Sequence, residues 1–173
     1  MLGNFVNRIT RFCAARFGEA VPGEGRYGEA EEKLAADLDG KIKSYTDNLA
    51  AMEFRKAFAD LRAIWVAGNE YLQLAAPWTK IKEDKVGAAA SVRAGLNLII
   101  LFAALSAPVI PFTAEKMFAI FGLDPKEAGR WPTSAKAALE FLKPGAAFTP
   151  PDVLFKKIED EQVAEWRERF GAE

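Results

Sequence analysis

Apolar side chains recur every three or four residues along most of the chain, and alternating runs of β-branched residues are absent. This spacing gathers apolar residues on one face of a helix and polar residues on the other. It predicts amphipathic helices over residues 2–17, 30–49, 53–74 and 159–170. The helix over 53–74 has one apolar stripe, which contains Phe54, Phe58, Leu61 and Trp65. We therefore expect an all-α protein.

A further long helix is predicted over residues 84–107, and this one is apolar on every side. Residues 94–114 carry no charge, and a stretch of that length could span a bilayer. However, polar residues and prolines interrupt the stretch, and the amphipathic helices need an apolar partner. We therefore expect a central buried helix, with a membrane span as the alternative. A short helix over 113–121 follows, with Thr113 as its N-cap.

The chain changes character after Gly122, where prolines and glycines become frequent. One short helix is predicted within this part, over residues 134–142. We interpret residues 1–122 as a helix bundle and residues 123–173 as a C-terminal segment of the same domain, which wraps the bundle and ends in the final helix.

Composition narrows the chemistry that these 173 residues can perform. The chain has no histidine and one cysteine, Cys13, which excludes Ser-His-Asp and Cys-His catalysis, histidine-ligated zinc and an internal disulfide. No pair of carboxylates marks an acid-base site, so we expect neither catalytic residues nor a metal site. The first residues lack the basic and apolar regions of an export signal, which predicts a cytoplasmic location.

The net charge of −1 gives no general attraction to polyanions, so a nucleic-acid partner would have to meet a local patch. One such patch is in the first predicted helix, where Arg8, Arg11 and Arg16 are present without an acidic residue up to Gly18. Asn4 lies one turn before Arg8. Amides beside guanidinium groups suit base edges and phosphates, although a solvated helix face is the ordinary alternative.

A second candidate is Trp78, which directly follows Pro77 at the end of the helix over 53–74. A tryptophan at this point can leave the helix and offer its ring as a stacking platform, with its backbone fixed by the proline. The alternative is a tryptophan that folds back to fill the core.

Three motifs identify a family when they are taken together. In chain order they are Leu2-Gly3-Asn4-Phe5-Val6-Asn7-Arg8, Asn69-x-Tyr71 with Ala76-Pro77-Trp78, and Pro108-Val109-Ile110-Pro111-Phe112-Thr113-Ala114. The set resembles the C-terminal anticodon-binding domain of methionyl-tRNA synthetase, a class I enzyme, over essentially the whole chain. The third motif is shared with the isoleucine, valine and leucine enzymes, whereas the first two are typical of the methionine enzyme.

The resemblance implies a helix bundle that recognises the CAU anticodon of methionine tRNA. It implies that Asn4 and Arg8 contact anticodon bases, that Trp78 stacks on them, and that Pro77 sets the angle of the ring. Such recognition agrees with the exposed Watson–Crick edges of single-stranded bases. Three cationic residues are candidate phosphate contacts, with solvated surface as the alternative: Arg11, Lys80 and Lys82. Of Asn69 and Tyr71, at least one is expected to be structural.

The catalytic half of that family carries a His-Ile-Gly-His motif and a Lys-Met-Ser-Lys-Ser loop, and neither occurs here. We therefore expect no amino-acid activation and no cofactor in this chain, although the parent enzyme would use ATP and magnesium. The expected partners are the anticodon stem-loop of methionine tRNA and the catalytic domain of the same synthetase, with the chain as a monomer away from membranes. Met1 is expected to be the start of an excised domain. The final helix is expected either to cover the bundle or to pack toward the catalytic half.

Two other functions stay open at this stage. One is a helical protein-interaction module that docks a partner through Trp78 and the first helix. The other is the anticodon-binding domain of a sister class I synthetase, for isoleucine, valine or leucine.

Overall fold

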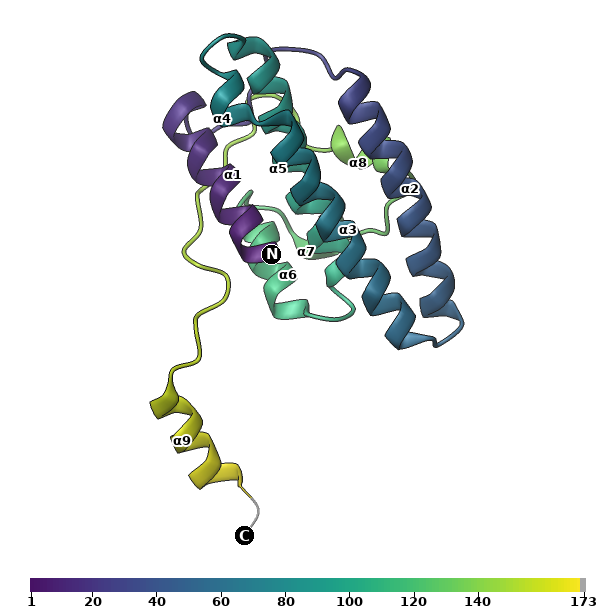
Figure 1. Cartoon of the computed structure of the whole chain (residues 1–173), viewed down its shortest axis with the longest axis vertical. Helices are drawn as coiled ribbons and strands as arrows, with labels where there is room; N and C mark the ends of the chain where they lie inside the picture. Colours follow the sequence, from purple (N-terminus) through teal and green to yellow (C-terminus); the bar gives the residue numbers. More distant parts are fainter. Residues whose placement is uncertain (172–173) are drawn as a thin grey trace.

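The computed structural model describes residues 1–171, and its regular elements within that range are all helices (Figure 1). The long helices are α1 (Leu2–Phe17), α2 (Glu29–Ala50), α3 (Phe54–Ala75) and α5 (Lys85–Ser106). The shorter ones are α4 (Pro77–Lys80), α6 (Pro111–Ala119), α7 (Pro125–Ala128), α8 (Ala135–Leu139) and α9 (Asp160–Phe170). The all-α prediction is confirmed, and the bounds of the long helices agree with the predicted ones to within one residue.

Helix α5 lies at the centre of the bundle, between α1 on one side and α3 on the other (Figure 1). Apart from Arg93, every residue from Ala88 to Ser106 is buried. The helix is long and apolar enough to cross a membrane, but 94% of its most apolar stretch is enclosed by the rest of the protein. The predicted central buried helix is therefore what the fold contains.

Two glycines let the neighbouring helices approach closely, one on α3 and one on α5 itself. A Cβ atom on Gly68 would lie 2.5 Å from Cζ of Phe102, and one on Gly95 would lie 2.8 Å from Cγ1 of Ile9. Real Cβ atoms do not approach their neighbours to such distances. The separations of α3 and α1 from α5 therefore depend on glycine at these two positions.

Two polar side chains of α5 attach the irregular parts of the chain to the bundle. The Arg93 guanidinium donates to three backbone carbonyls of the loop 22–25 at 2.8–3.1 Å. The buried Asn97 amide donates to the carbonyl of Arg93 at 3.0 Å and accepts from the backbone N–H of Leu142 at 2.7 Å. Buried amides are tolerated when their hydrogen bonds are made, and here those bonds fix two distant segments.

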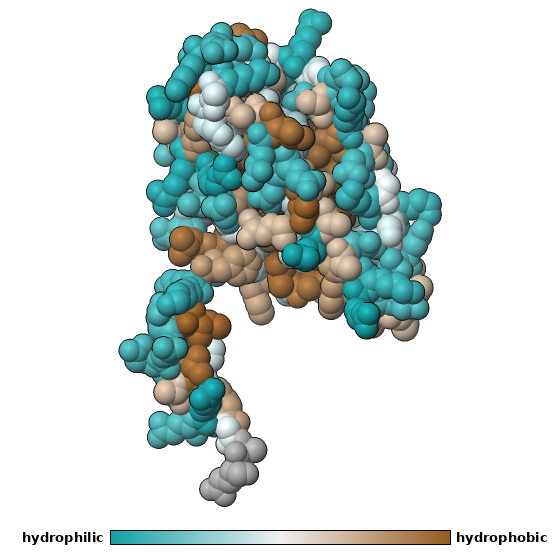
Figure 2. Space-filling model, in the orientation of Figure 1, coloured by the Kyte–Doolittle hydropathy of each residue, from teal (hydrophilic) through white to brown (hydrophobic). Residues whose placement is uncertain are grey.

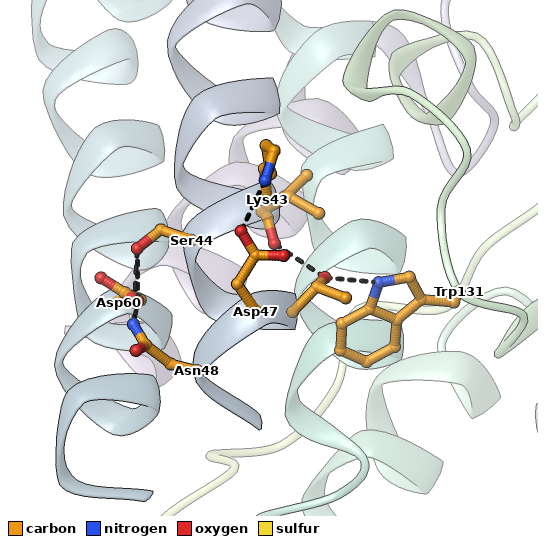
Figure 3. Close-up of polar contacts among 8 residues, drawn as sticks. Lys43, Ser44, Asp47, Asn48, Asp60 and Trp131 are labelled. Carbon is orange, nitrogen blue, oxygen red and sulfur yellow. Dashed lines mark hydrogen bonds and ion pairs between the residues drawn. The ribbon is translucent and has the colours of Figure 1, made fainter. Parts of the chain in front are cut away.

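The C-terminal segment follows the bundle surface from Leu123 to the buried Phe148. Trp131 stacks on Tyr45 with ring centroids 5.6 Å apart, and its indole N–H donates to the hydroxyl of Thr46 at 3.0 Å. Figure 3 shows this ring against α2, beside a second network in which Ser44 and Asn48 donate to Asp60 of α3. These contacts hold α2 to both α3 and the wrapping segment.

Helix α9 does not cover the bundle. The chain leaves the bundle after the wrapping part and α9 projects from it (Figure 1), with none of its residues buried. Figure 2 shows hydrophobic surface along this projecting helix, which carries Trp166 and Phe170 at 44% and 71% exposure. The other expectation, that α9 packs toward a catalytic half, stays a prediction.

Two local predictions were wrong. Helix α6 begins at Pro111 with Ile110 as its N-cap, not at Thr113. A proline is favoured at the first helical position, because the backbone N–H at that position makes no hydrogen bond within the helix. The buried stripe of α3 also differs from the predicted one, since Phe54 and Phe58 are about half exposed. It consists of Ala57, Leu61, Ile64, Ala67, Gly68, Tyr71 and Leu72. At 100° per residue this stripe is centred about 70° from the predicted one.

Gly68→Ala should lower the free energy of unfolding by about 1–3 kcal/mol, because the added methyl group overlaps the buried Phe102 ring. Gly40→Ala is the matched control in the exposed middle of α2, where nothing lies within 4 Å of the added Cβ. That change should stabilise the protein by about 0.5–1 kcal/mol. Urea unfolding followed by far-ultraviolet circular dichroism measures both, and equal effects of the two variants would contradict the close packing of α3 on α5.

Candidate nucleic-acid interface

The connection between α3 and α5 places Trp78 against α1. Ala76 ends α3 in the left-handed region, with φ 39° and ψ 55°, and the buried Pro77 then opens the one-turn helix α4. This reversal directs α4 back along the bundle. Trp78 is therefore part of a helix, and its side chain is half-buried. Its position is intermediate between the two that the sequence allowed, a ring fully open for stacking and a ring that fills the core.

Arg8 and Phe12 of α1 contact the Trp78 ring. The guanidinium carbon of Arg8 lies 4.3 Å from the ring centroid, in a cation–π arrangement, and Phe12 meets the ring edge-on at 6.3 Å between centroids. Within residues 1–171 no carboxylate lies within ion-pair distance of Arg8, so its charge is available to a ligand. The result is a flat cationic and aromatic surface, and bases stack on both indole rings and guanidinium planes.

The structure brings Arg8, Pro77 and Trp78 together. Asn4 lies closer to the N-terminus of α1. Asn4 is exposed one helical turn before Arg8, a rise of about 6 Å. On the same helix, Asn7 accepts a hydrogen bond from Nε of the exposed Arg11 at 2.6 Å. The amides and guanidinium groups therefore form a continuous polar strip that runs from the start of α1 to Trp78.

The candidate phosphate contacts do not all lie beside Arg8 and Trp78, since Lys80 lines a hollow with Glu31 of α2 and Glu70 of α3. Lys80 and Lys82 are exposed at the end of α4 and in the turn before α5. Nζ of Lys80 lies 3.7 Å from Oδ2 of Asp84, which partly neutralises it, whereas Lys82 has no carboxylate within that range among the described residues. Lys82 and Arg11 are thus the less compensated charges.

The structure settles one of the two motif residues on α3. Tyr71 is buried, and its hydroxyl group donates a hydrogen bond to the buried Glu31 of α2. Burial and the neighbouring carboxylate both raise the pKa of Tyr71. Asn69 donates from its side chain to the carbonyl of Trp65 in its own helix at 2.8 Å. Tyr71 is therefore a structural residue that joins α2 to α3.

Cys13 lies on the buried face of α1, and burial raises the pKa of its thiol to about 12. Since the thiolate is the reactive form, this side chain is inert in the folded protein. Within residues 1–171 no group of three or more histidine, cysteine, aspartate or glutamate side chains is placed to hold a metal ion.

Two residues that sequence reasoning did not select pack near these side chains of α1. Phe12 is four residues after Arg8 and therefore lies on the same face of α1. This helical spacing could have indicated that both side chains contact Trp78. Phe155 packs on Gly3 at the start of α1, where a Cβ atom would lie 3.0 Å from its Cδ2. No pattern in the sequence indicates this contact, which joins the two ends of the chain.

Comparison with known proteins gives consistent results. A family model described as the anticodon binding domain of methionyl tRNA ligase matches residues 21–173. The methionine–tRNA ligase of Ruegeria sp. strain TM1040 is 54% identical over 171 residues, and that of Caulobacter vibrioides strain NA1000 is 53% identical over 172. Each alignment covers 99% of this chain but only 29% and 30% of the relative, so the chain spans about three tenths of their length.

Solved structures give the same fold. The free-state methionyl-tRNA synthetase of Mycobacterium tuberculosis superposes with a TM-score of 0.78 at 23% identity, over 91% of this chain and 32% of that one. The same enzyme with methionyl-adenylate bound gives a TM-score of 0.76 over 90% of this chain. The helical architecture is therefore shared with these proteins.

A pH titration tests the burial of the tyrosines, of which Tyr45 and Tyr71 are buried and Tyr27 is half-buried. Burial raises the pKa of all three, Tyr27, Tyr45 and Tyr71, above the ordinary value of 10.0. A raised pKa in the folded state means that the stabilisation is complete below pH 10 and is lost as the pH rises above it. The folded protein should show little tyrosinate absorbance at pH 10, and the signal should appear together with loss of helical circular dichroism.

The control is the same titration in denaturant, where all three tyrosines should ionise near pH 10. Half of the tyrosinate signal at that pH in a protein with its helices intact would show that the tyrosines are not buried as described.

Proposed function

The chain belongs to the family of anticodon-binding domains of methionyl-tRNA ligase, and from that premise we propose that it binds the CAU anticodon loop of methionine tRNA through α1 and α4. The observation that carries the proposal is the Arg8 guanidinium over the Trp78 ring on a surface without a carboxylate partner. Single-stranded bases are recognised by this combination of flat surfaces and fixed donors. In this proposal the residues around Arg8 and Trp78 bind RNA and do not catalyse a reaction.

Each residue of the surface has a distinct role in this proposal. Trp78 stacks on an anticodon base, and because Arg8 covers one face of the ring, the base lies on the other face or on the outer plane of the guanidinium. Arg8 donates to an acceptor pair on a base edge, and the Asn4 amide both donates and accepts. The buried Pro77 fixes the backbone that carries the ring.

Arg11, Lys80 and Lys82 contact phosphates next to the bases. Their charges are exposed, and they lie on the elements that flank Arg8 and Trp78. Contacts of this kind add affinity without base selectivity.

The remaining part of the synthetase supplies the reaction. Activation of methionine, which uses ATP and magnesium, belongs to the catalytic part that this chain does not span, and the chain itself acts without a cofactor and without catalytic residues. Its partners are the anticodon stem-loop and that catalytic part. It works as a monomer in the cytoplasm, and it does not enter a membrane, in keeping with the burial of its apolar helix α5 inside the bundle.

Trp78→Ala should weaken binding of a CAU anticodon hairpin by about 5- to 150-fold, the range for loss of one base stack. The matched control is Trp166→Ala, which removes a half-exposed tryptophan from α9 and should leave the affinity unchanged. Fluorescence anisotropy of a labelled hairpin measures both variants. A second hairpin, with only the first anticodon base replaced, measures base selectivity.

The outcomes separate the proposal from its two rivals. Equal affinity for both hairpins would leave a nonspecific cationic face and would favour a protein-interaction module. Tighter binding of a hairpin with an isoleucine, valine or leucine anticodon would assign the chain to a sister synthetase.

Salt dependence tests the phosphate contacts. Each contact to single-stranded RNA contributes about 0.7 to the slope of log affinity against log salt concentration. Lys82→Gln should therefore reduce the slope by about that amount and leave the preference for CAU unchanged. If the slope does not change, Lys82 does not contact a phosphate and is an ordinary solvated residue. The control is Lys43→Gln on α2, where the exposed Lys43 pairs with Asp47, and this change should leave the slope as it is.

A further inference from the structure

Three aromatic rings form a row along α1, beside α4 (Figure 1). The first ring is Trp78, which meets Phe12 at 6.3 Å between centroids, with the two rings nearly perpendicular at 88°. Phe12 in turn meets Phe17, the last residue of α1, at 6.4 Å and 68°. The ammonium group of Lys85, the first residue of α5, lies 5.9 Å from the centroid of Phe17. The row therefore connects Trp78 to the start of the central helix.

The row is supported from inside the bundle. All three rings are half-buried, and all three pack against the hydrophobic core. Aromatic rings that meet edge-to-face at such distances prefer one mutual orientation, because the positive edge of one ring faces the negative face of the other. The orientation of each ring in the row therefore restricts the orientation of the next.

Trp78 needs such a support because α4 fixes only its backbone. The left-handed Ala76 and the buried Pro77 determine where the short helix starts, but the indole ring can still rotate about its side-chain bonds. Arg8 covers one face of the ring, and in the proposed function its guanidinium also donates to a base edge. Phe12 has no hydrogen-bonding group in its side chain, so its contact with Trp78 does not compete with contacts to RNA.

We propose that Phe12 is a positioning residue for recognition of the anticodon loop, and that Phe17 assists it by holding the Phe12 ring. The inference rests on the proposed function, because it acts through the stack on Trp78. Phe12 contributes without touching the RNA, since it restricts the free protein to orientations of the Trp78 ring that can accept a base. The affinity falls in proportion when a smaller part of the population is competent to bind.

The test is a double-mutant cycle between Phe12 and Trp78, with the affinity for the CAU hairpin measured by fluorescence anisotropy. Phe12→Leu removes the aromatic contact and should weaken binding by about 2- to 12-fold, the range for loss of one aromatic pair. In a protein that already carries Trp78→Ala, Phe12→Leu should have no further effect, because the ring that it positions is absent. Phe12→Tyr keeps the aromatic contact and should bind like the unchanged protein.

The matched control is Phe58→Leu, which breaks another aromatic pair, with Phe54 on α3, at the same centroid distance of 6.4 Å as the pair of Phe12 and Phe17. It should leave the affinity for the hairpin unchanged. Phe17→Leu repeats the cycle at the other end of the row and should weaken binding only when Trp78 is present. This variant decides the matter if Phe12→Leu does not fold.

A second measurement needs no RNA. The contribution of Trp78 to the near-ultraviolet circular dichroism is the difference between a protein with Trp78 and the same protein with Trp78→Phe. This contribution should be smaller in Phe12→Leu than in the unchanged protein, because a ring with several orientations gives a weaker signal. The far-ultraviolet signal of the helices should be retained. An unchanged contribution of Trp78 would overturn the positioning role.

The cycle separates this inference from the proposed function. A loss of affinity by the same factor with and without Trp78 would show that Phe12 acts independently of that ring, which overturns the positioning role. An unchanged affinity in Phe12→Leu would overturn it as well. In both cases the proposed function stands, provided that Trp78→Ala weakens binding. If Trp78→Ala binds the CAU hairpin as tightly as the unchanged protein, the proposed function and this inference fail together.

Discussion

Helix α5 has to be enclosed on all sides, because its side chains from Ala88 to Ser106 are apolar or small almost without exception. Its neighbours achieve this by approaching closely at Gly68 and Gly95, where a larger residue would separate the helices. The few polar groups on α5 then attach the loop before α2 and the C-terminal segment through Arg93 and Asn97. The positions of α1 and α4, and hence of Arg8 and Trp78, follow from how they cover this one helix.

The surface proposed to bind the anticodon loop is already ordered by contacts within the protein. The Trp78 ring meets Phe12 edge-on and is covered on one face by Arg8, and the preceding Pro77 is buried. Side chains that are already ordered lose less entropy on binding than mobile ones. Because Arg8 has no carboxylate partner among residues 1–171, this surface carries a local positive charge although the net charge of the chain is −1.

The sequence predicted the long helices well because their apolar spacing is regular, and it predicted the family because three motifs occur in order. It failed where small residues decide the packing. The large side chains of Phe54 and Phe58 suggested the stripe, whereas the buried face of α3 includes Ala57 and Gly68, and Gly68 is where α3 meets α5. It could not give the contact of Arg8 with Trp78 or of Gly3 with Phe155, since no local pattern connects residues so far apart. The sequence also did not predict that α9 extends away from the bundle.

The close approach of α1 to α5 also bears on how the chain is made. The apolar face of α1, with Phe5 and Ile9, is synthesised before α5, and Gly95 and Phe102, which cover it, follow about 90 residues later. At translation rates of about 5–20 residues per second, that interval is on the order of 4–20 s. During this time α5 is not yet present to cover the apolar face of α1. Among the helices that pack on α5, α1 therefore waits longest for the partner that covers it, so the first helix of the proposed RNA surface is completed late in the folding of this segment.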